Sequence, residues 1–301
     1  MDPLRSLLFV PGHREDWVDK AIASGADALI FDLEDSVPLA LKPEARLAVR
    51  RSIERIAGQQ TGTSVYVRVN PLGTHLTGDD IEAVAVEGLA GLSLPMLHGP
   101  HDVVRYDALV EHFEHRAGLQ SGTIEFICNL ETAEAFASCE QFAAASPRVA
   151  TLFAGTARDA DVSRSIGFQF TPEGLETLYL RSRAILAARA SGLTWPLVGL
   201  WQDLDDPEGA ERFARQNRQL GFRGQVLIHP SHVAFVNETY GPSADEVQFY
   251  SGMIEAFAEA EARGSAAVAY RGMHVDYAHV KTAHEVLRLA TQLGMDGSSP
   301  D

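Results

Sequence analysis

The sequence is poor in cysteine and has no long apolar runs. Only two cysteines, Cys128 and Cys139, stand among its 301 residues, too few for a disulfide framework and typical of a reducing compartment. No apolar run reaches the roughly 18 residues that a membrane-spanning helix requires. The first residues lack the pattern of a signal peptide. We therefore expect a cytoplasmic protein that neither crosses nor binds a membrane.

Positive charge is also scarce. The chain has 25 Lys and Arg against 41 Asp and Glu, a formal net charge of −16. This balance argues against binding to nucleic acid, which requires basic surfaces. It does not exclude an anionic small substrate, because a few cations near a site can outweigh negative charges that lie far from it. The sequence also lacks dinucleotide-binding, Walker, Cys-x-x-Cys and serine-hydrolase motifs, so nucleotide hydrolysis and serine hydrolase chemistry lose support.

Short β-branched or aromatic runs alternate with longer amphipathic segments, a pattern typical of parallel α/β folds. About eight such units in one chain predict a (β/α)₈ TIM barrel over residues 1–242. Residues 243–301 are expected to form a C-terminal helical lid and oligomerisation segment. The predicted strands cover residues 6–12, 27–34, 64–70, 91–95, 123–131, 149–155, 196–201 and 225–230. The predicted helices cover 15–24, 43–56, 79–87, 101–115, 133–145, 172–191, 207–220, 244–263 and 277–293, with a short strand at 266–270.

Polar residues close several of these strands, which favours a barrel over a doubly wound sheet. Glu34, Arg68, Glu131 and the pair Asp159 and Asp161 lie at or just past successive strand ends, and in a barrel those ends meet at one mouth. Elsewhere, His229 is expected to bond to backbone rather than act as a base. The helix at 207–220 is expected to be capped by the preceding pair Asp205-Asp206, with Pro207 at its first position.

Each polar group allows a structural and a functional interpretation. Glu34 and Asp35, which follow Asp32, could cap a helix, but crowded carboxylates repel unless a cation or hydrogen bonds compensate. Arg68 could simply neutralise Glu34 or Asp35, or its planar fork could hold a carboxylate or an enolate oxygen.

Glu131 and Asp161 could each cap a helix. Because they close consecutive strands, they could instead sit side by side and hold Mg²⁺, which typically takes one or two carboxylates and leaves positions for water and substrate.

The chain resembles the citrate lyase β-subunit-like family, which includes malyl-CoA and citramalyl-CoA lyases and belongs to the HpcH/HpaI aldolase group. The resemblance runs in order along nearly the whole chain. It rests on these segments: Arg5–Gly12, Gly25–Val37, Glu44–Arg46, Val67–Asn70, Glu131–Ala133, Asp161 with Ile166 and Gly167, Ile228–Pro230, and Gly272 with Val275 and Asp276.

The resemblance implies a TIM barrel that assembles as a homotrimer or hexamer, and a cytoplasmic metal-dependent oxo-acid-lyase of the aldolase type. Its metal would be Mg²⁺, which Mn²⁺ could replace, and its partners an acyl-CoA and a 2-keto acid. The metal ligands fall on Glu131 and Asp161. Arg68 would hold the keto acid or enolate oxygen, Glu34 and Asp35 would orient it, and Asp276 would reach the site from a neighbouring subunit.

Two departures from the family pattern fall at the predicted mouth. Met96 follows Leu94-Pro95 where a lysine is common, and the usual Gly-Gly-Glu-Asp is replaced by Arg158-Asp159-Ala160-Asp161. The metal pair remains. We expect cleavage or formation of a 3-hydroxyacyl thioester of malyl-CoA, citramalyl-CoA or citryl type. Thioesterase or malate synthase-like activity on the same enolate, and a non-catalytic acyl-CoA-binding paralogue, remain as alternatives.

Overall fold

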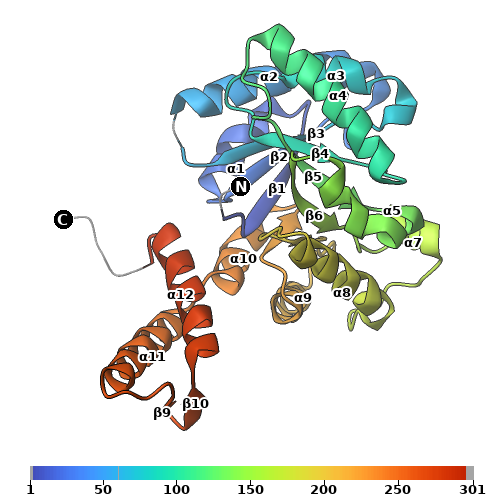
Figure 1. The fold of residues 1–301 in the computed structure, drawn as a ribbon. Helices are drawn as coiled ribbons and strands as arrows, with labels where there is room; N and C mark the ends of the chain where they lie inside the picture. The colour runs from blue at the N-terminus through green and yellow to red at the C-terminus, as the bar shows by residue number, and fades with distance from the viewer. Residues whose placement is uncertain (1–2, 60, 296–301) are drawn as a thin grey trace. The chain divides into compact units, whose positions relative to one another are not determined.

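The computed structural model describes residues 3–59 and 61–295. Their strands β1 to β8 form a closed parallel barrel in which each strand bonds to the next along the chain and β8 bonds to β1 (Figure 1). The predicted barrel is therefore confirmed. Its strands are β1 (Ser6–Pro11), β2 (Ala28–Asp32), β3 (Ser64–Arg68), β4 (Gly91–Leu94), β5 (Glu125–Leu130), β6 (Val149–Ala154), β7 (Leu197–Val198) and β8 (Gly224–Leu227).

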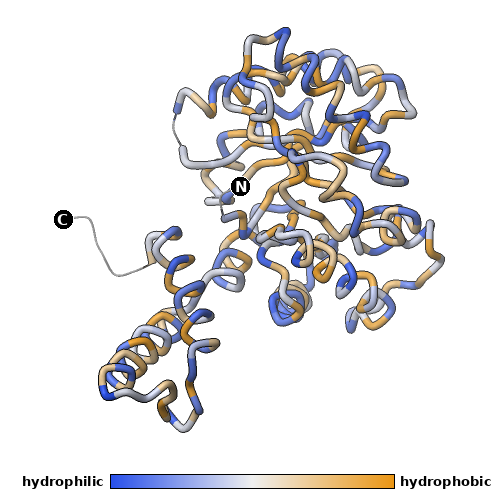
Figure 2. Tube along the Cα trace, in the orientation of Figure 1, coloured by the Kyte–Doolittle hydropathy of each residue, from blue (hydrophilic) through white to orange (hydrophobic). Residues whose placement is uncertain are grey.

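Helices follow the strands and surround the barrel. Every residue of β2 is buried, as expected of a parallel strand covered on both faces. Apolar residues run along the barrel strands, whereas polar and apolar positions mix on the helices (Figure 2). The helices of this part are α1 (Val18–Ala23), α2 (Lys42–Gln59), α3 (Thr77–Val84), α4 (Pro100–Ala117), α5 (Ala133–Ser138), α6 (Phe142–Ala145), α7 (Asp161–Ile166), α8 (Leu175–Ala190), α9 (Pro207–Leu220) and α10 (Val233–Tyr240).

The helix predicted over residues 133–145 is broken in the structure. The chain ends α5 at Ser138, makes a 3₁₀ turn at Cys139–Gln141, and resumes as α6. The Arg183 guanidinium donates a 2.9 Å hydrogen bond to the Ala137 carbonyl. The Ser138 hydroxyl donates a 2.8 Å hydrogen bond to the Glu134 carbonyl. Side chains that compete for backbone carbonyls bend or end a helix. Because Arg183 lies far along the chain from this helix, the hydrophobic period of residues 133–145 could not predict the contact.

Two α-helices and one strand lie outside the predicted set. These are α7, α10 and the strand β10 (Met273–Val275). In addition, α8 begins at Leu175 instead of residue 172, and β7 is only two residues long. Helices of two turns or fewer and strands of three residues contain too few positions for a hydrophobic period to be read.

The chain divides into two compact units, one ending at Asn237 and the other beginning at Glu238. The second unit contains α11 (Ala244–Ala262), an antiparallel pair of β9 (Val268–Tyr270) with β10, and α12 (Tyr277–Gln292). It has its own small core, formed by Met253, Phe257, Val275 and Ala283. The lid and oligomerisation roles of this region stay predictions. Among the described helices, none is long and apolar enough to cross a membrane.

The predicted cap of α9 is present and can be tested. The Asp206 carboxylate accepts a 2.8 Å hydrogen bond from the Gly209 amide, with Pro207 in the first turn. We expect Asp206→Ala to lower the free energy of unfolding by about 1 kcal/mol, the usual cost of losing an N-cap. Urea denaturation measures this loss. Asp205→Ala is the matched control, because Asp205 is exposed, and an equal loss in both variants would contradict the assignment.

Candidate active site

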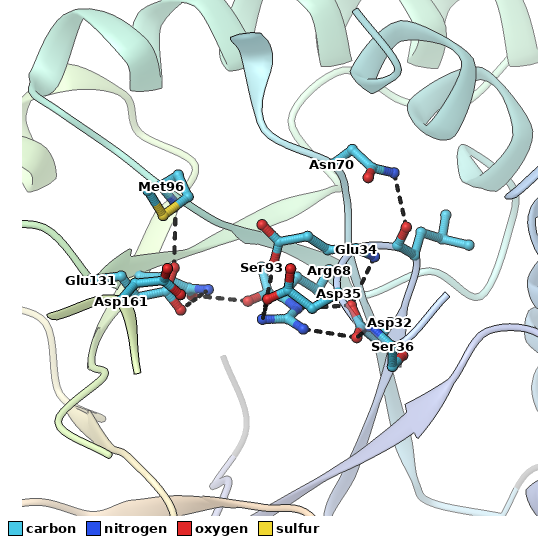
Figure 3. A network of polar contacts seen from close by, with 12 residues as sticks. Asp32, Glu34, Asp35, Ser36, Arg68, Asn70, Ser93, Met96, Glu131 and Asp161 are labelled. Atoms are coloured by element: carbon cyan, nitrogen blue, oxygen red, sulfur yellow. Dashed lines mark hydrogen bonds and ion pairs between the residues drawn. The ribbon is translucent and has the colours of Figure 1, made fainter. Parts of the chain in front are cut away.

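A cavity of about 400 Å³ opens where the barrel strands end, and its walls include Asp35, Arg68, Glu131 and Asp161. Arg68 closes β3, Glu131 follows β5, and Asp161 begins α7 after β6. The structure thus brings together four of the residues that the sequence placed at the mouth (Figure 3). Active sites of such barrels lie at this end, where the loops that follow the strands meet.

The Arg68 side chain is locked by Asp32, the last residue of β2. Backbone register places the two residues directly opposite each other. Arg68 Nε and Nη2 donate to the two Asp32 oxygens at 2.8 and 2.7 Å. Burial alone would raise the pKa of the Asp32 carboxyl, but the charge and hydrogen bonds of Arg68 hold it below its ordinary value. The predicted pairing of Arg68 with Glu34 or Asp35 is also present; what the sequence interpretation missed is the two-pronged bond of Arg68 to Asp32, a residue that it had placed only in the acidic strand end.

Glu34 and Asp35 take different positions around the same guanidinium. Glu34 Oε2 lies 2.9 Å from Arg68 Nη1, whereas Asp35 Oδ2 lies 3.8 Å away with its side chain 72% exposed. Burial raises the pKa of Glu34 to about 8 against the pull of Arg68, and the carboxylates of Glu131, Asp35 and Asp32 raise it further. Glu34 therefore holds its proton over a range in which an exposed glutamate is ionised.

This shift predicts a pH-dependent loss of stability. Because the pKa of Glu34 rises from 4.5 unfolded to about 8 folded, the folded state keeps a proton that the unfolded state releases. Its contribution is complete below about pH 4.5 and is lost as the pH rises through about 8. Relative to Glu34→Gln, the wild-type protein should lose stability between pH 5 and 8, at up to about 1.4 kcal/mol per pH unit.

Urea denaturation of both proteins without divalent metal measures this difference. A difference that stays constant from pH 5 to 8 would mean that Glu34 is ionised throughout in the folded protein. The comparison with glutamine removes the titration of all other groups that the two proteins share.

Glu131 and Asp161 line the same cavity, and Asp161 also forms an ion pair with Arg164; their role as a metal-binding pair stays a prediction. Asn129 Nδ2 and the Met96 amide each donate to Glu131 over a long 3.3 Å. Burial raises the pKa of Glu131, and the nearby Asp161 carboxylate raises it further. Gly155 makes room for this carboxylate, because a Cβ there would lie 3.0 Å from Glu131 Cγ.

The pair suits a hard divalent cation. Two carboxylates that face one cavity repel each other, and a cation such as Mg²⁺ converts that repulsion into binding. Within residues 3–59 and 61–295, no group of three or more His, Cys, Asp or Glu side chains forms a metal cage. A cation held by Glu131 and Asp161 would therefore keep positions for water and substrate, as Mg²⁺ commonly does.

A buried layer behind the cavity positions these groups. Lys42 Nζ donates to the carbonyls of Leu33 and Glu34 and to Asn70 Oδ1 at 2.7–2.9 Å, which fixes the segment after β2. Ser93 bonds to Asn129, which in turn reaches Glu131. The alternation of strands and helices in the sequence predicts that these positions lie near strand ends. It does not distinguish polar residues that support a site from other polar residues.

The remaining candidates lie outside this network. Asp276 caps α12 in the second unit, where its carboxylate accepts hydrogen bonds from the Ala278 and His279 amides and lies 2.7 Å from His279 Nδ1. Its catalytic role stays a prediction. His229 Nδ1 accepts a 3.2 Å hydrogen bond from the Ser231 amide, as expected, and also lies 2.7 Å from the Ser231 hydroxyl. Both cysteines are free and buried, and burial raises the pKa of each thiol, so neither behaves as a nucleophile.

Residues 5–230 match the family model described as HpcH/HpaI aldolase/citrate lyase. The chain belongs to this family. The HpcH/HpaI family resemblance, together with the expected lyase class, is thereby confirmed.

Individual HpcH/HpaI family members resemble the chain over nearly its whole length. The citrate lyase β subunit of Leuconostoc mesenteroides is 32% identical, over 95% of this chain and 93% of its own. A (3S)-malyl-CoA thioesterase of Cereibacter sphaeroides is 31% identical, over 96% and 95%. The crystal structure of CitE from Mycobacterium tuberculosis, in complex with magnesium, acetoacetate and coenzyme A, superposes with a TM-score of 0.74 at 28% identity, covering 96% and 98%.

Proposed function

We propose that the chain is a Mg²⁺-dependent carbon–carbon lyase that cleaves a 3-hydroxyacyl thioester, in CoA form, into an acyl thioester and a 2-keto acid. One observation carries the proposal: Glu131 and Asp161 face the same cavity as the buried cation Arg68. Relatives named for citrate lyase and for L-malyl-CoA/β-methylmalyl-CoA lyase support the reaction class. The CitE complex with magnesium and coenzyme A supports the metal and the thioester.

In cleavage, a base accepts the proton of the 3-hydroxyl group and the bond between the carbinol carbon and the thioester α-carbon breaks. The electrons of that bond pass into a thioester enolate, and the 2-keto acid is released. Mg²⁺ held by Glu131 and Asp161 would supply a Lewis acid for the keto acid oxygens. Arg68 contributes a fixed positive charge that stabilises the developing anion, and its bonds to Asp32 remove the cost of reorganising it. Asp276, after taking up a proton from solvent, would return it to the enolate carbon, and in the synthetic direction its carboxylate would remove one.

The products separate the candidate functions. With L-malyl-CoA and Mg²⁺, a lyase releases acetyl-CoA and glyoxylate in equal amounts, and a chelator stops the reaction. A thioesterase, which relatives of that name favour, releases free CoA and malate instead. Condensation of acetyl-CoA with glyoxylate followed by release of free CoA would indicate malate synthase-like activity. A protein that binds acyl-CoA but forms none of these products, over a panel of 3-hydroxyacyl-CoAs, would be the non-catalytic paralogue.

We further propose a homotrimer, or a hexamer built from trimers, in which Asp276 serves a neighbouring subunit. Asp276→Ala and Glu131→Gln should each abolish turnover. If the two residues meet between subunits, mixing and reassembling the two inactive variants restores part of the activity, because some sites then receive both intact residues. No recovery from the reassembled mixture would contradict a role for Asp276 between subunits.

A further inference from the structure

The predicted metal ligand Asp161 already has a cationic partner on its own helix. Arg164 lies on α7, three residues after Asp161, a spacing that places both side chains on one face of the helix. Its Nη2 forms an ion pair with Asp161 Oδ1, and both residues line the cavity. One of the two oxygens that Asp161 could offer a metal ion is therefore occupied by a guanidinium.

This ion pair can open at small cost. The side chain of Arg164 is 68% exposed and that of Asp161 is 33% exposed, and ion pairs in contact with water contribute little, because solvent screens both charges. Arg68, in contrast, donates two hydrogen bonds to the buried Asp32 carboxylate. Of the two arginines that line the cavity, Arg164 is therefore the one that can leave its carboxylate.

Asp159 provides a second carboxylate for Arg164. It lines the same cavity, and Arg164 Nη1 lies 3.4 Å from its backbone carbonyl oxygen. In the part of the chain that the structure describes, no cation pairs with the Asp159 carboxylate. Its backbone has a positive φ of 51°, a conformation that aspartate tolerates better than most residues. Arg164 therefore contacts two acidic residues of one short segment but forms an ion pair with only one of them.

The charges of the cavity show why the second carboxylate matters. The lining residues include four acids against two arginines, Arg68 and Arg164, an excess that one divalent cation balances. A cation held by Glu131 and Asp161 would lie close to the guanidinium of Arg164, and like charges at short range repel each other. If Arg164 moved to Asp159, this repulsion would fall and both aspartates would have a cation.

We propose that Arg164 is an internal competitor of the divalent cation, which pairs with Asp161 in the metal-free protein and moves to Asp159 when the cation binds. This inference rests on the proposed function, in which Glu131 and Asp161 hold Mg²⁺. It gives Arg164 no contact with the substrate. Arg164 instead sets how tightly the metal is held, and it keeps Asp161 paired until a cation arrives.

Calorimetric titration of the full chain with Mg²⁺ tests the competition. Arg164→Gln should tighten Mg²⁺ binding about two- to fivefold, the scale of one exposed ion pair. Added salt should reduce this difference, because salt screens exposed charges. Arg158→Gln is the matched control, since Arg158 is exposed on the same segment and packs over Phe170, and it should change the affinity by less than about twofold.

Three results of this titration would overturn the proposal. Weaker binding by Arg164→Gln would mean that Arg164 supports Asp161 as a ligand. Unchanged binding would mean that the guanidinium does not compete with the metal. An equal change in Arg158→Gln would reduce the effect to the net charge of the segment.

A double-mutant cycle tests the second position of Arg164. Asp159→Asn should weaken Mg²⁺ binding, because it removes the partner that Arg164 takes in the metal-bound state. The loss should be smaller, by about twofold or more, in the Arg164→Gln background, where no guanidinium has to move. Equal losses in both backgrounds would overturn the proposal. A loss as large as that of Glu131→Gln would make Asp159 a metal ligand and would also overturn it.

Glu131→Gln separates this inference from the proposed function. If the wild type binds Mg²⁺ and Glu131→Gln binds it about a hundredfold more weakly, the metal site stands, and the Arg164 and Asp159 variants alone decide the inference. If the wild type binds no Mg²⁺, the proposed function and the inference fail together. Crystal structures of the full chain without and with Mg²⁺ should show Arg164 on Asp161 and then on Asp159, and Arg164 on Asp161 in both would overturn the inference.

Discussion

Replacing Arg68 with glutamine is expected to lower turnover about a hundred- to a thousandfold and to destabilise the fold. Asp32 is 4% exposed at its side chain, and without Arg68 it would be a buried charge without a cation. Removing one partner of such a pair costs about 3–5 kcal/mol. The loss of turnover follows from the loss of a fixed charge beside the developing anion. Urea denaturation and steady-state kinetics measure the two effects.

A second substitution separates the structural from the chemical role of Arg68. Asp32→Asn combined with Arg68→Gln removes both charges, so stability should recover in part while turnover stays low. Arg68→Lys keeps the charge but loses the two-pronged geometry, and it should fall between the wild type and glutamine. Recovery of full turnover in the double variant would show that Arg68 serves only to neutralise Asp32.

Replacing Glu131 with glutamine is expected to weaken Mg²⁺ binding about a hundredfold or more and to abolish turnover without unfolding the barrel. In the proposed metal site this carboxylate is one of two protein ligands, so its loss would remove half of the protein donors. Calorimetric titration with Mg²⁺ and thermal unfolding measure the two effects. Glu134→Gln is the matched control, because Glu134 is exposed at the start of α5.

The Glu131→Gln substitution is also expected to change the thermal stability of the metal-free protein, in a direction that can be stated. Burial raises the pKa of Glu131, so without metal this carboxyl contributes less to stability above its ordinary pKa than below it, whereas glutamine does not titrate. As the pH rises above that value, the unfolding temperature of the variant should therefore rise relative to that of the wild type. A large drop in the unfolding temperature would mean that the carboxylate supports the fold, and unchanged Mg²⁺ affinity would remove Glu131 from the metal site.

The barrel and the general place of the site could be predicted from the sequence because both follow from local pattern. Alternating runs give the strands, and polar residues at strand ends mark the mouth. The pairing of Arg68 with Glu34 could be predicted, but its two-pronged bond to Asp32 could not, since the three acids are close in sequence and only the register of β2 against β3 places Asp32 opposite Arg68. The break between α5 and α6 depends on Arg183 from α8, a contact across 46 residues.

The residues around the cavity come from two kinds of element, the barrel strands and the segments that connect them, and this difference suggests how the substrate preference of such a site could change. Arg68 and Asp32 sit at the ends of strands whose pairing the whole barrel imposes. Met96 and Asp159, in contrast, lie in connecting segments with positive φ angles of 49° and 51°, and Arg164 follows on a short helix. Natural selection could therefore exchange one acid substrate for another by altering the connecting segments, while the inherited charge pair in the barrel wall stays constant.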